Sequence, residues 1–573
     1  MTPRHHAPFP AIAAAVVALL GGCATAPAPA PPPPAVTGPV LVKVLAINDF
    51  HGNLKAPPGG IRIADPSAPP NPANPANPST VRRINVPAGG VEAMATLLDQ
   101  LRAKNPNHAF VAAGDLVGAT PLLSSLFRDE PTIEAMNLMG LDAAAMGNHE
   151  LDRGPAELLR LQGGGCHPVE GCKGPQAFAG AKFQYLAANT IVQATGKTLL
   201  PPYFVKRFQG IPVAFIGLTL KNTPSVVVPS GVAGLRFEGE ADTVNALVPQ
   251  LQKQGIEAIV VVMHEGGFGG GNHNDCPAAS GAILEIVPRL SKAVDLVITG
   301  HTHAAYNCVI DGRTVTSADR YGTLVTQIDL VLDPATRDVV SAKAENLIVG
   351  TADFAPHPRL SQLVSTYETL VRPLAQRKVT TLAAPLSARV DEATGESAMG
   401  QVIADAQLSA TREQGAQLAL MNPGGVRASL GGDGKLDVVY EDVFSVQPFY
   451  NQLVTMSLTG AQLLQLLEQP LRGARARPLF ISRGFSYSWD SRLPPGQRVL
   501  VDTLRLNGQP VRADQVVRLT VNNFIADGGD DMGVLRQGRD RQPGPIDVDA
   551  LEAYLKATPG LKPDAQPRIT QLK

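Results

Sequence analysis

The sequence predicts a two-domain protein, in which an α/β layered domain is followed by a smaller α+β domain. Apolar, β-branched runs alternate with stretches of helical periodicity over the first 350 residues, as in α/β domains. Polar side chains cluster just past the ends of these runs, where open α/β sheets bind their ligands. A chain of 573 residues is also too long for one ordinary core, so two domains with tails are expected.

Four strand-like runs of the first domain end directly in residues that can carry chemistry. They cover residues 40–47, 109–113, 259–263 and 296–299. The helix-like stretches between them cover residues 91–104, 132–139 and 243–254. We therefore expect a first domain over residues 40–350, with its functional residues at the carboxyl ends of its strands.

A connecting helix and a second domain are expected after residue 350. Residues 361–377 place apolar side chains at helical spacing, within a linker at 351–380, and Pro373 is expected to kink or shorten this helix. The second domain is expected over residues 381–570. Its predicted helices are 400–410 and 459–468, and its predicted strands are 418–421 and 516–521.

The first 23 residues have the pattern of a signal peptide. Residues 11–20 are apolar, too short to span a bilayer, and lead into Leu-Gly-Gly-Cys at 20–23. Small residues before a cysteine resemble the lipobox of bacterial lipoproteins. The resemblance implies a lipid on Cys23 and an outer-membrane protein that faces the periplasm or the cell surface. An ordinary secretory signal with a chance cysteine is the alternative.

Two proline-rich stretches are expected to lie outside the folded cores. Residues 24–39 are almost entirely Ala and Pro and predict an extended tether. Residues 56–80 predict a surface loop without chemistry of its own.

The charge balance restricts the partners. The chain has 49 Lys and Arg against 50 Asp and Glu, a net charge of −1. Proteins that bind nucleic acid polymers through the phosphate backbone usually carry an excess of basic residues, so no nucleic acid polymer is expected as a partner. A small anionic substrate needs only a few local cations or metal ions and fits this composition. We expect a monomer whose only membrane contact is the lipid on Cys23.

Four cysteines remain beyond Cys23, and an even number in an exported protein indicates disulfides. Three pairings are open. Cys166 with Cys172 would close a short Gly-rich loop, which leaves Cys276 with Cys308 as the second bridge. A zinc site that uses His167 or His273 is the alternative, although the spacing matches no zinc ligand pattern.

Five short motifs of the first domain supply carboxylate, amide and imidazole groups. At three of them a glycine precedes the Asp, Asn or His and lets the backbone turn sharply. Oxygen and imidazole donors together suit Zn, Mn, Fe or Co. Two ions about 3.5–4 Å apart would need one shared carboxylate. In chain order the motifs are Asp49-Phe50-His51-Gly52, Gly114-Asp115, Gly147-Asn148-His149-Glu150, His264 and Gly300-His301-Thr302-His303.

These motifs resemble those of the calcineurin-like dinuclear metallophosphoesterases, which are D-x-H, G-D, G-N-H-(E/D), H and G-H-x-H in that order. The resemblance implies a four-layer α/β sandwich that holds two divalent metal ions. The ligands that it implies for the first ion are Asp49, His51, Asp115 and His303. Those that it implies for the second ion are Asp115, Asn148, His264 and His301, with Asp115 as the bridge.

His149 matches the catalytic histidine of that family, and Asp152 matches the carboxylate that orients it and keeps it protonated. The resemblance implies hydrolysis by a metal-activated water, with His149 stabilising charge on the phosphoryl and leaving oxygens. Glu150 is expected to be structural. A single Asp in a turn is commonly a cap and a lone His commonly a core residue, but five motifs in order favour the metal site.

Three motifs of the second domain resemble those of the 5′-nucleotidase C-terminal domain. They are Asn422-Pro423-Gly424-Gly425-Val426-Arg427, Gln447-Pro448-Phe449-Tyr450-Asn451 and Asn523-Phe524-Ile525-Ala526-Asp527-Gly528-Gly529-Asp530. The roles that the resemblance implies are stacking on the base by Phe449 and Phe524, a base contact by Asn451, a ribose contact by Asp530 and a phosphate contact by Arg427. Core packing is the alternative for the two rings.

The two resemblances together span most of residues 40–565 and predict hydrolysis of nucleotide phosphate esters, by a 5′-nucleotidase with UDP-sugar hydrolysis as an extension. One alternative is a 2′,3′-cyclic-nucleotide phosphodiesterase and 3′-nucleotidase with the same metal centre. Another is a non-catalytic, nucleotide-binding surface lipoprotein. The chain has Tyr450 where the family often has Gly and His303 where some members have Gln. Arg389 is the nearest candidate for the further arginines of the family.

Overall fold

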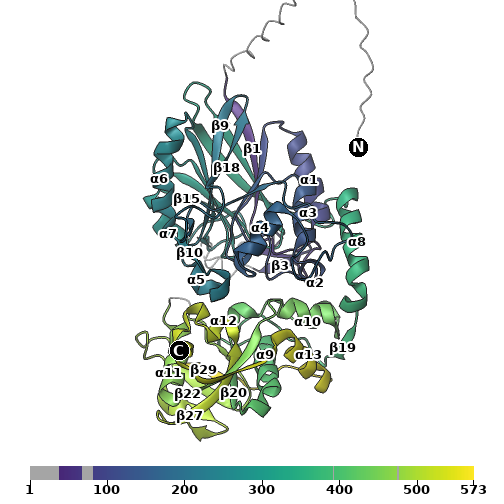
Figure 1. Ribbon diagram of the computed structural model, residues 1–573, viewed down its shortest axis with the longest axis vertical. Helices are drawn as coiled ribbons and strands as arrows, with labels where there is room; N and C mark the ends of the chain where they lie inside the picture. Colours follow the sequence, from purple (N-terminus) through teal and green to yellow (C-terminus); the bar gives the residue numbers. More distant parts are fainter. Residues whose placement is uncertain (1–37, 68–81, 392, 474–475, 573) are drawn as a thin grey trace, which may run out of the picture.

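The computed structural model describes residues 38–67, 82–391, 393–473 and 476–572. They form two bodies, one above the other in Figure 1, connected along one side by helix α8 (Pro358–Ala375). The signal peptide, Cys23, the tether as far as residue 37 and the Asn-Pro stretch at 71–78 lie outside the described residues. In the part of the chain that the structure describes, no helix combines the length and apolar character that a membrane span requires.

The N-terminal body contains two six-stranded sheets. The strand order of the first sheet is β18 (Val339–Ile348), β17 (Leu324–Leu332), β1 (Val40–Ile47), β4 (His108–Ala112), β5 (Ala143–Ala145) and β6 (Gln184–Leu186). The strand order of the second sheet is β15 (Ala305–Ile310), β16 (Arg313–Ala318), β14 (Leu296–Thr299), β11 (Ala258–His264), β9 (Ile211–Thr219) and β8 (Tyr203–Phe208).

The two sheets pack face to face through a core of apolar side chains, among them Val42 and Val44 of β1 and Val213 and Phe215 of β9. In the first sheet β1, β4, β5 and β6 are parallel, and in the second β9, β11, β14 and β16 are parallel. Because parallel strands end at the same edge, the loops after β1, β4, β5, β11 and β14 are brought to one end of the sandwich.

Helices cover the outer face of each sheet and complete four layers (Figure 1). Those against the first sheet are α1 (Val91–Ala103), α2 (Leu122–Ser125), α3 (Glu130–Met139) and α4 (Pro155–Gly163), and those against the second are α6 (Glu240–Lys253) and α7 (Ile283–Ile286). The predicted four-layer α/β sandwich is therefore confirmed.

The C-terminal body is a smaller α+β unit. Its five-stranded sheet has the order β23 (Phe480–Ile481), β20 (Leu418–Met421), β27 (Val516–Asn522), β22 (Gln452–Thr459) and β28 (Arg539–Ile546). Its four-stranded sheet has the order β26 (Gln509–Pro510), β25 (Arg505–Leu506), β24 (Phe485–Asp490) and β29 (Ile569–Leu572). Its helices are α9 (Ala398–Ala410), α10 (Tyr440–Val446), α11 (Gly460–Glu468), α12 (Asn523–Ala526) and α13 (Asp547–Ala557).

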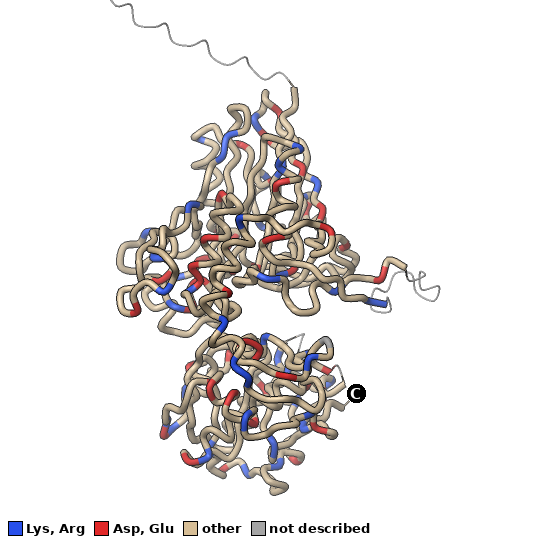
Figure 2. The backbone as a smooth tube through the Cα atoms, turned by 90° about the vertical axis from the view of Figure 1, so that its right-hand side faces the viewer, with Lys and Arg blue, Asp and Glu red and all other residues tan. Residues whose placement is uncertain are grey.

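A short helix and four two-stranded pairs lie outside the main sheets of the two bodies. They are helix α5 (Thr223–Val226) and the two-stranded pairs β2 (Ile61–Ala64) with β3 (Arg83–Val86), β7 (Thr190–Val192) with β10 (Leu235–Phe237), β12 (Gly267–Phe268) with β13 (Ser280–Gly281), and β19 (Lys378–Thr381) with β21 (Asp437–Val439). Basic and acidic residues intermingle over both bodies (Figure 2).

Helix α8 lies along the N-terminal body and buries Leu360, Val364 and Val371. It begins three residues before the predicted start, because Pro358 fits the first turn of a helix, where its missing N–H costs nothing. Pro373 lies inside the helix, which ends at Ala375.

Two disulfides are present, Cys166 to Cys172 and Cys276 to Cys308, with Cα atoms 4.6 Å and 5.2 Å apart. This is the expected pairing and excludes these four thiols as zinc ligands.

Candidate active site

The metal-type side chains lie on sharp turns after strands of both sheets. Asp49 (φ 48°) and His51 (φ 46°) follow β1, Asp115 (φ 50°) follows β4, and His301 (φ 71°) follows β14. Left-handed φ values are costly for residues with a Cβ atom and gather where function requires a particular side-chain direction. These turns therefore direct the predicted ligands toward one another.

Asp49, His51 and His303 form one group of donor atoms, all within 4.8 Å of one another. His303 Nε2 lies 3.3 Å from Asp49 Oδ1 and 3.2 Å from His51 Nε2. These are three of the four ligands that the sequence predicts for the first metal ion.

Asp115, His264 and His301 form a second such group. His264 Nε2 lies 3.0 Å from Asp115 Oδ2 and 3.1 Å from Asn148 Oδ1, and His301 Nδ1 lies 3.1 Å from the same amide oxygen. Asp115 Oδ2 also lies 3.6 Å from His51 Nε2, between the two groups. This is the position that a bridging carboxylate requires.

The donor chemistry fits divalent cations. His51 Nδ1 donates to Gly118 O and His264 Nδ1 donates to Ala113 O, both over 2.8 Å. In the neutral rings, both Nε2 atoms therefore present lone pairs to the interior of the site. Because these lone pairs face carboxylate and amide oxygens, acceptors meet acceptors unless a cation or a proton lies between them. Two divalent ions would resolve that repulsion.

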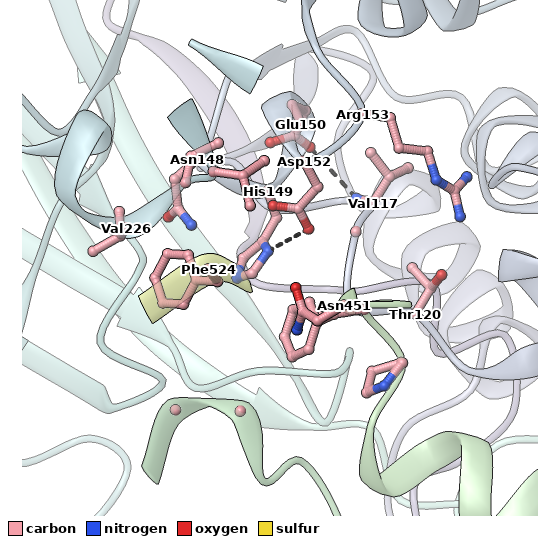
Figure 3. A pocket seen from close by; sticks show the side chains of 18 of the residues that line it. Val117, Thr120, Asn148, His149, Glu150, Asp152, Arg153, Val226, Asn451 and Phe524 are labelled. Carbon is pink, nitrogen blue, oxygen red and sulfur yellow. Dashed lines mark hydrogen bonds and ion pairs between the residues drawn. The ribbon is translucent and has the colours of Figure 1, made fainter. Parts of the chain in front are cut away.

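His149 lies beside these groups, and Figure 3 shows its contact with Asp152. Its Nδ1 lies 2.7 Å from Asp152 Oδ2, and its backbone N–H donates to Asp115 Oδ1 over 2.9 Å. Burial by itself lowers the pKa of His149, but the carboxylates of Asp152 and Asp115 outweigh burial and hold the pKa above its usual value. The imidazolium form is thereby favoured.

Glu150 ties two of the ligand loops together. Its Oε2 accepts hydrogen bonds from the backbone N–H groups of Gly147 (2.6 Å) and Asp115 (3.0 Å), and its Oε1 accepts from Leu116 N–H (2.8 Å). Burial and the nearby charge of Asp115 raise the pKa of Glu150 to about 7. These contacts fit the structural role that was expected for it.

A cleft between the two bodies opens onto this site. Asn148, His149, Asp152 and His301 of the N-terminal body line it, together with all five residues that the sequence predicts for substrate contacts. Those five are Arg427, Phe449, Asn451, Phe524 and Asp530. Figure 3 shows Asn451 and Phe524 beside His149. Asp49, His51, Asp115 and His264 are fully or almost fully buried behind the cleft.

Both phenylalanine rings are partly exposed and line this cleft, and Phe524 also packs against the apolar core of the C-terminal body. The Phe449 ring stacks on His149, with centroids 5.9 Å apart and an interplanar angle of 25°. The guanidinium of Arg427 lies 5.8 Å from the centroid of the same ring. Arg427 Nε and Nη2 are buried without a hydrogen-bond partner in the described structure, which suits a residue that binds an anionic group of a substrate.

Two buried asparagines position Asp530. Asn522 Nδ2 donates to Asn422 Oδ1 over 2.9 Å, and Asn422 Nδ2 donates to Asp530 Oδ2 over 2.7 Å. Sequence reasoning did not single out Asn422, although it opens the quoted N-x-G-G-x-R motif and could have been found there. It also missed Arg153 and the Val226–Val228 segment, which line the cleft but belong to no motif. Arg389 does not line the cleft.

The four-layer sandwich and this donor set define the class of dinuclear metallophosphoesterases. Residues 42–305 match the calcineurin-like phosphoesterase family, and residues 377–537 match the 5′-nucleotidase, C-terminal domain family.

Known proteins share both parts. Endonuclease YhcR of Bacillus subtilis is 31% identical over 82% of this chain, although the chain spans only 37% of that protein. A 5′-nucleotidase of Vibrio cholerae is 25% identical over 95% of each protein. The solved structure of a 5′-nucleotidase precursor from Thermus thermophilus is 26% identical, with a TM-score of 0.75 over 93% of this chain and 99% of that one. The chain belongs to the 5′-nucleotidase family of calcineurin-like metallophosphoesterases.

Proposed function

We propose that this protein is a metal-dependent phosphoesterase that hydrolyses the phosphate ester of 5′-nucleotides. The observation that carries the proposal is the cleft, because it places metal-type donors and His149 of one body opposite Phe449, Phe524 and Asp530 of the other. Nucleotide sugars are a second substrate class for the same site.

Two divalent ions, chosen among Zn, Mn, Co and Fe, would be held by the two donor groups. Asp49, His51 and His303 hold the first and Asn148, His264 and His301 the second, while Asp115 contributes to both. When bound, such ions activate water for in-line attack on phosphorus and offset phosphoryl charge. Imidazole, carboxylate and amide ligands suit all four metals, so the donor set alone does not select one.

The side chains of the cleft take the remaining roles. His149, kept protonated by Asp152, donates a hydrogen bond to the phosphoryl or leaving oxygen as negative charge develops there. The guanidinium of Arg427 binds the phosphoryl oxygens. Phe449 and Phe524 stack on the base, Asn451 contacts its edge, and Asp530 accepts from the ribose hydroxyls.

Phosphate release by the protein that starts after Cys23 tests this proposal. AMP, UDP-glucose and 2′,3′-cyclic AMP are each assayed after chelation and after addition of Mn, Co or Zn. Metal-restored release from AMP is the expected result, and Asp115→Asn should abolish it while the fold survives. Activity on the cyclic nucleotide alone would move the protein to the phosphodiesterase class. A folded protein without activity on any substrate would be a nucleotide-binding lipoprotein instead.

We also propose that the protein is an exported, monomeric lipoprotein anchored through Cys23 at the outer membrane. The apolar run at 11–20 and the Leu-Gly-Gly-Cys sequence support this. The described chain enters the N-terminal body at the end away from the C-terminal body (Figure 1), so an anchor there would leave the cleft accessible. Radiolabelled palmitate should enter the wild type but not Cys23→Ala, and light scattering of the anchor-free protein should give one chain's mass.

A further inference from the structure

We propose that a polar bay beside His149 is the subsite for the glycosyl group of nucleotide sugars, and that Arg153 is its specificity-determining residue. The bay is the part of the cleft that is lined by Thr120, Ser125, Asp129 and Arg153. The inference rests on the proposed function and deepens it, because it assigns side chains to the second substrate class. None of these four residues lies in a sequence motif.

The bay lies on the far side of His149 from the base-stacking ring of Phe524. Figure 3 shows Phe524 on one side of His149, and Arg153 with Thr120 on the other. All four residues line the same cleft. A nucleotide whose base stacks on Phe524 and whose phosphate lies beside His149 therefore leaves the bay unfilled. Only a substituent attached to the phosphate on the side away from the nucleoside can reach it.

Two turns with left-handed backbone form the wall of the bay. Ala119 (φ 50°) precedes Thr120, and Arg128 (φ 53°) and Asp129 (φ 66°) form the turn before α3. Thr120 Oγ1 donates to Asp129 Oδ1 over 2.6 Å, which joins the two turns. Left-handed φ values cost free energy in residues with a Cβ atom and cluster at functional sites. The metal-type ligands of this protein lie on turns of the same kind.

Arg153 offers hydrogen-bond donors to a ligand in the bay. Its Nη2 donates to Ser125 Oγ over 3.2 Å, and its Nη1 lies 3.5 Å from Asp129 Oδ2. These contacts hold the guanidinium in place and use at most two of its five N–H groups. Arg153 has no further hydrogen-bond partner among the described residues, and 30% of its side chain is exposed. The remaining N–H groups can therefore donate to a bound group.

The charge of the bay favours hydroxyl groups over a further phosphate. The buried carboxylate of Asp129 offsets the charge of Arg153, and Glu157, which is itself paired with Arg160, lines the same cleft. A second phosphate would meet both carboxylates. A sugar hydroxyl both donates and accepts hydrogen bonds, so it can accept from Arg153 and donate to Asp129. This mixture of donors and acceptors fits a glycosyl group.

Hydrolysis of a nucleotide sugar in this position consumes one water molecule. The water oxygen bonds to the phosphorus that carries the glycosyl group, and the bond from that phosphorus to the bridging oxygen of the pyrophosphate breaks. The bridging oxygen leaves with the nucleoside monophosphate, and a sugar phosphate is the other product. Both protons of the water are released, because the two products are close to dianions at neutral pH. The glycosyl group thus remains in the bay while the nucleotide departs on the side of Phe524.

A pair of substrates tests the bay. UDP-glucose and the methyl ester of UDP share the base and the pyrophosphate, but only UDP-glucose has sugar hydroxyls. With manganese-loaded wild-type protein, kcat/KM for UDP-glucose should exceed that for the methyl ester by roughly 10- to 100-fold. Arg153→Ala should remove most of this preference while it lowers kcat/KM for the methyl ester by less than about threefold. Arg153→Lys keeps a charge beside Asp129 and should retain part of the preference.

Arg289→Ala is the matched control, because it also removes an arginine that is paired with an aspartate. Arg289 Nη2 donates to Asp242 Oδ1 over 2.7 Å, and neither residue lines the cleft. This variant should keep the full preference. Equal kcat/KM values for the two substrates in the wild type would overturn the proposal. An equal loss on both substrates in Arg153→Ala would also overturn it, because Arg153 would then bind the pyrophosphate or support the fold.

Calorimetric titration provides a readout that does not depend on turnover. In Asp115→Asn protein, UDP-glucose should bind roughly 10- to 100-fold more tightly than the methyl ester of UDP, and the additional change Arg153→Ala should remove most of this difference. Equal affinities for the two compounds would overturn the proposal. If the wild type hydrolyses no nucleotide, the proposed function fails, and this titration still decides whether the bay binds the glycosyl group.

Discussion

At the scale of single residues, the outer ring nitrogens of His51, His264 and His149 orient these side chains in the site. The carbonyl of Gly118 accepts a hydrogen bond from Nδ1 of His51, and the carbonyl of Ala113 accepts one from Nδ1 of His264. Nε2 of each ring is thereby left for a metal ion. Asp152 plays the corresponding part for His149, but as a carboxylate it favours the charged ring. In the metal-free protein His51 is therefore a neutral ligand and His149 an imidazolium donor, whereas His264 must lose a proton before its Nε2 can bind a metal ion.

Metal binding should release about one proton per protein at pH 7.5. Burial lowers the pKa of His264, but Asp115 outweighs burial and raises it to about 10 in the metal-free protein, so a metal ion must displace that proton. Burial lowers the pKa of His301 to about 4 and that of His51 well below its usual value, so these rings are already neutral. Metal affinity should therefore rise with pH through the neutral range, by about tenfold per pH unit for the one proton displaced.

Calorimetric titration of the metal-free protein in two buffers of different ionisation enthalpy measures this proton. Asp115→Asn should remove the release and weaken metal binding, because the carboxylate that holds the proton on His264 is absent. A heat of binding that does not depend on the buffer would show that His264 is neutral before the metal binds.

Glu150→Gln should destabilise the fold and loosen the metal site. The amide retains one acceptor oxygen and turns an NH2 group toward backbone N–H donors that the carboxylate satisfied. We expect a loss of about 2–3 kcal/mol in the free energy of unfolding, with weaker metal binding. Urea denaturation and metal analysis measure both effects. Glu265→Gln is the control, because Glu265 Oε1 accepts a hydrogen bond from Gly266 N–H, which Gln keeps. Equal stability of the two variants would contradict the role of Glu150.

At the scale of elements, the loop after β4 fits tightly against the catalytic histidine. Gly118 has φ 82°, and its carbonyl accepts the hydrogen bond from His51. A Cβ atom there would lie 2.6 Å from His149 O and 2.8 Å from Asp152 Oδ2. Position 118 therefore has no room for a side chain unless the His149–Asp152 pair is displaced.

Gly118→Ala should lower kcat by roughly 10- to 100-fold, because the added methyl group separates His149 from Asp152. Gly154→Ala is a matched control, since Gly154 has φ 81° but nothing within 4 Å of the added Cβ atom. Both variants should lose about 1 kcal/mol from backbone strain, and Gly118→Ala should lose more through the clash. Equal kcat values for the two variants would rule out this tight fit as a requirement for catalysis.

At the scale of the whole molecule, substrate-binding and metal-type residues belong to different bodies, and α8 connects the two (Figure 1). Phe449 of one body already stacks on His149 of the other, so a bound nucleotide would be enclosed from both sides. Entry and release should then require the bodies to move apart, with α8 near the hinge.

Crosslinking the two bodies should slow turnover by at least about tenfold, because product release needs them to separate. Helix α5 lies against the turn at Gly529–Asp531, so cysteines replacing Ser225 and Asp531 can be joined with a short bis-maleimide. The same double variant capped with N-ethylmaleimide is the control. Full turnover by the crosslinked protein would show that the bodies need not separate.

Strand and helix positions follow closely from the sequence, because they depend on local periodicity. Residues 40–47, 296–299 and 418–421 are β1, β14 and β20 as predicted. Helix α6 begins at Glu240, three residues before its predicted start. The acidic side chains of Glu240 and Asp242 stabilise the positive end of the helix dipole, an effect that the spacing of apolar residues does not reveal.

The sequence by itself determined the α/β architecture, the donor types and their order, since side-chain chemistry and strand periodicity are local properties. Only the tertiary structure decided which atoms meet. The contacts of Asp115 with both histidine groups, the hydrogen bonds of Glu150 to the loop after β4, and the stacking of Phe449 on His149 all join segments far apart in the chain. Local periodicity carries no information about such contacts, because they depend on how strands register and how two separately folded bodies face each other.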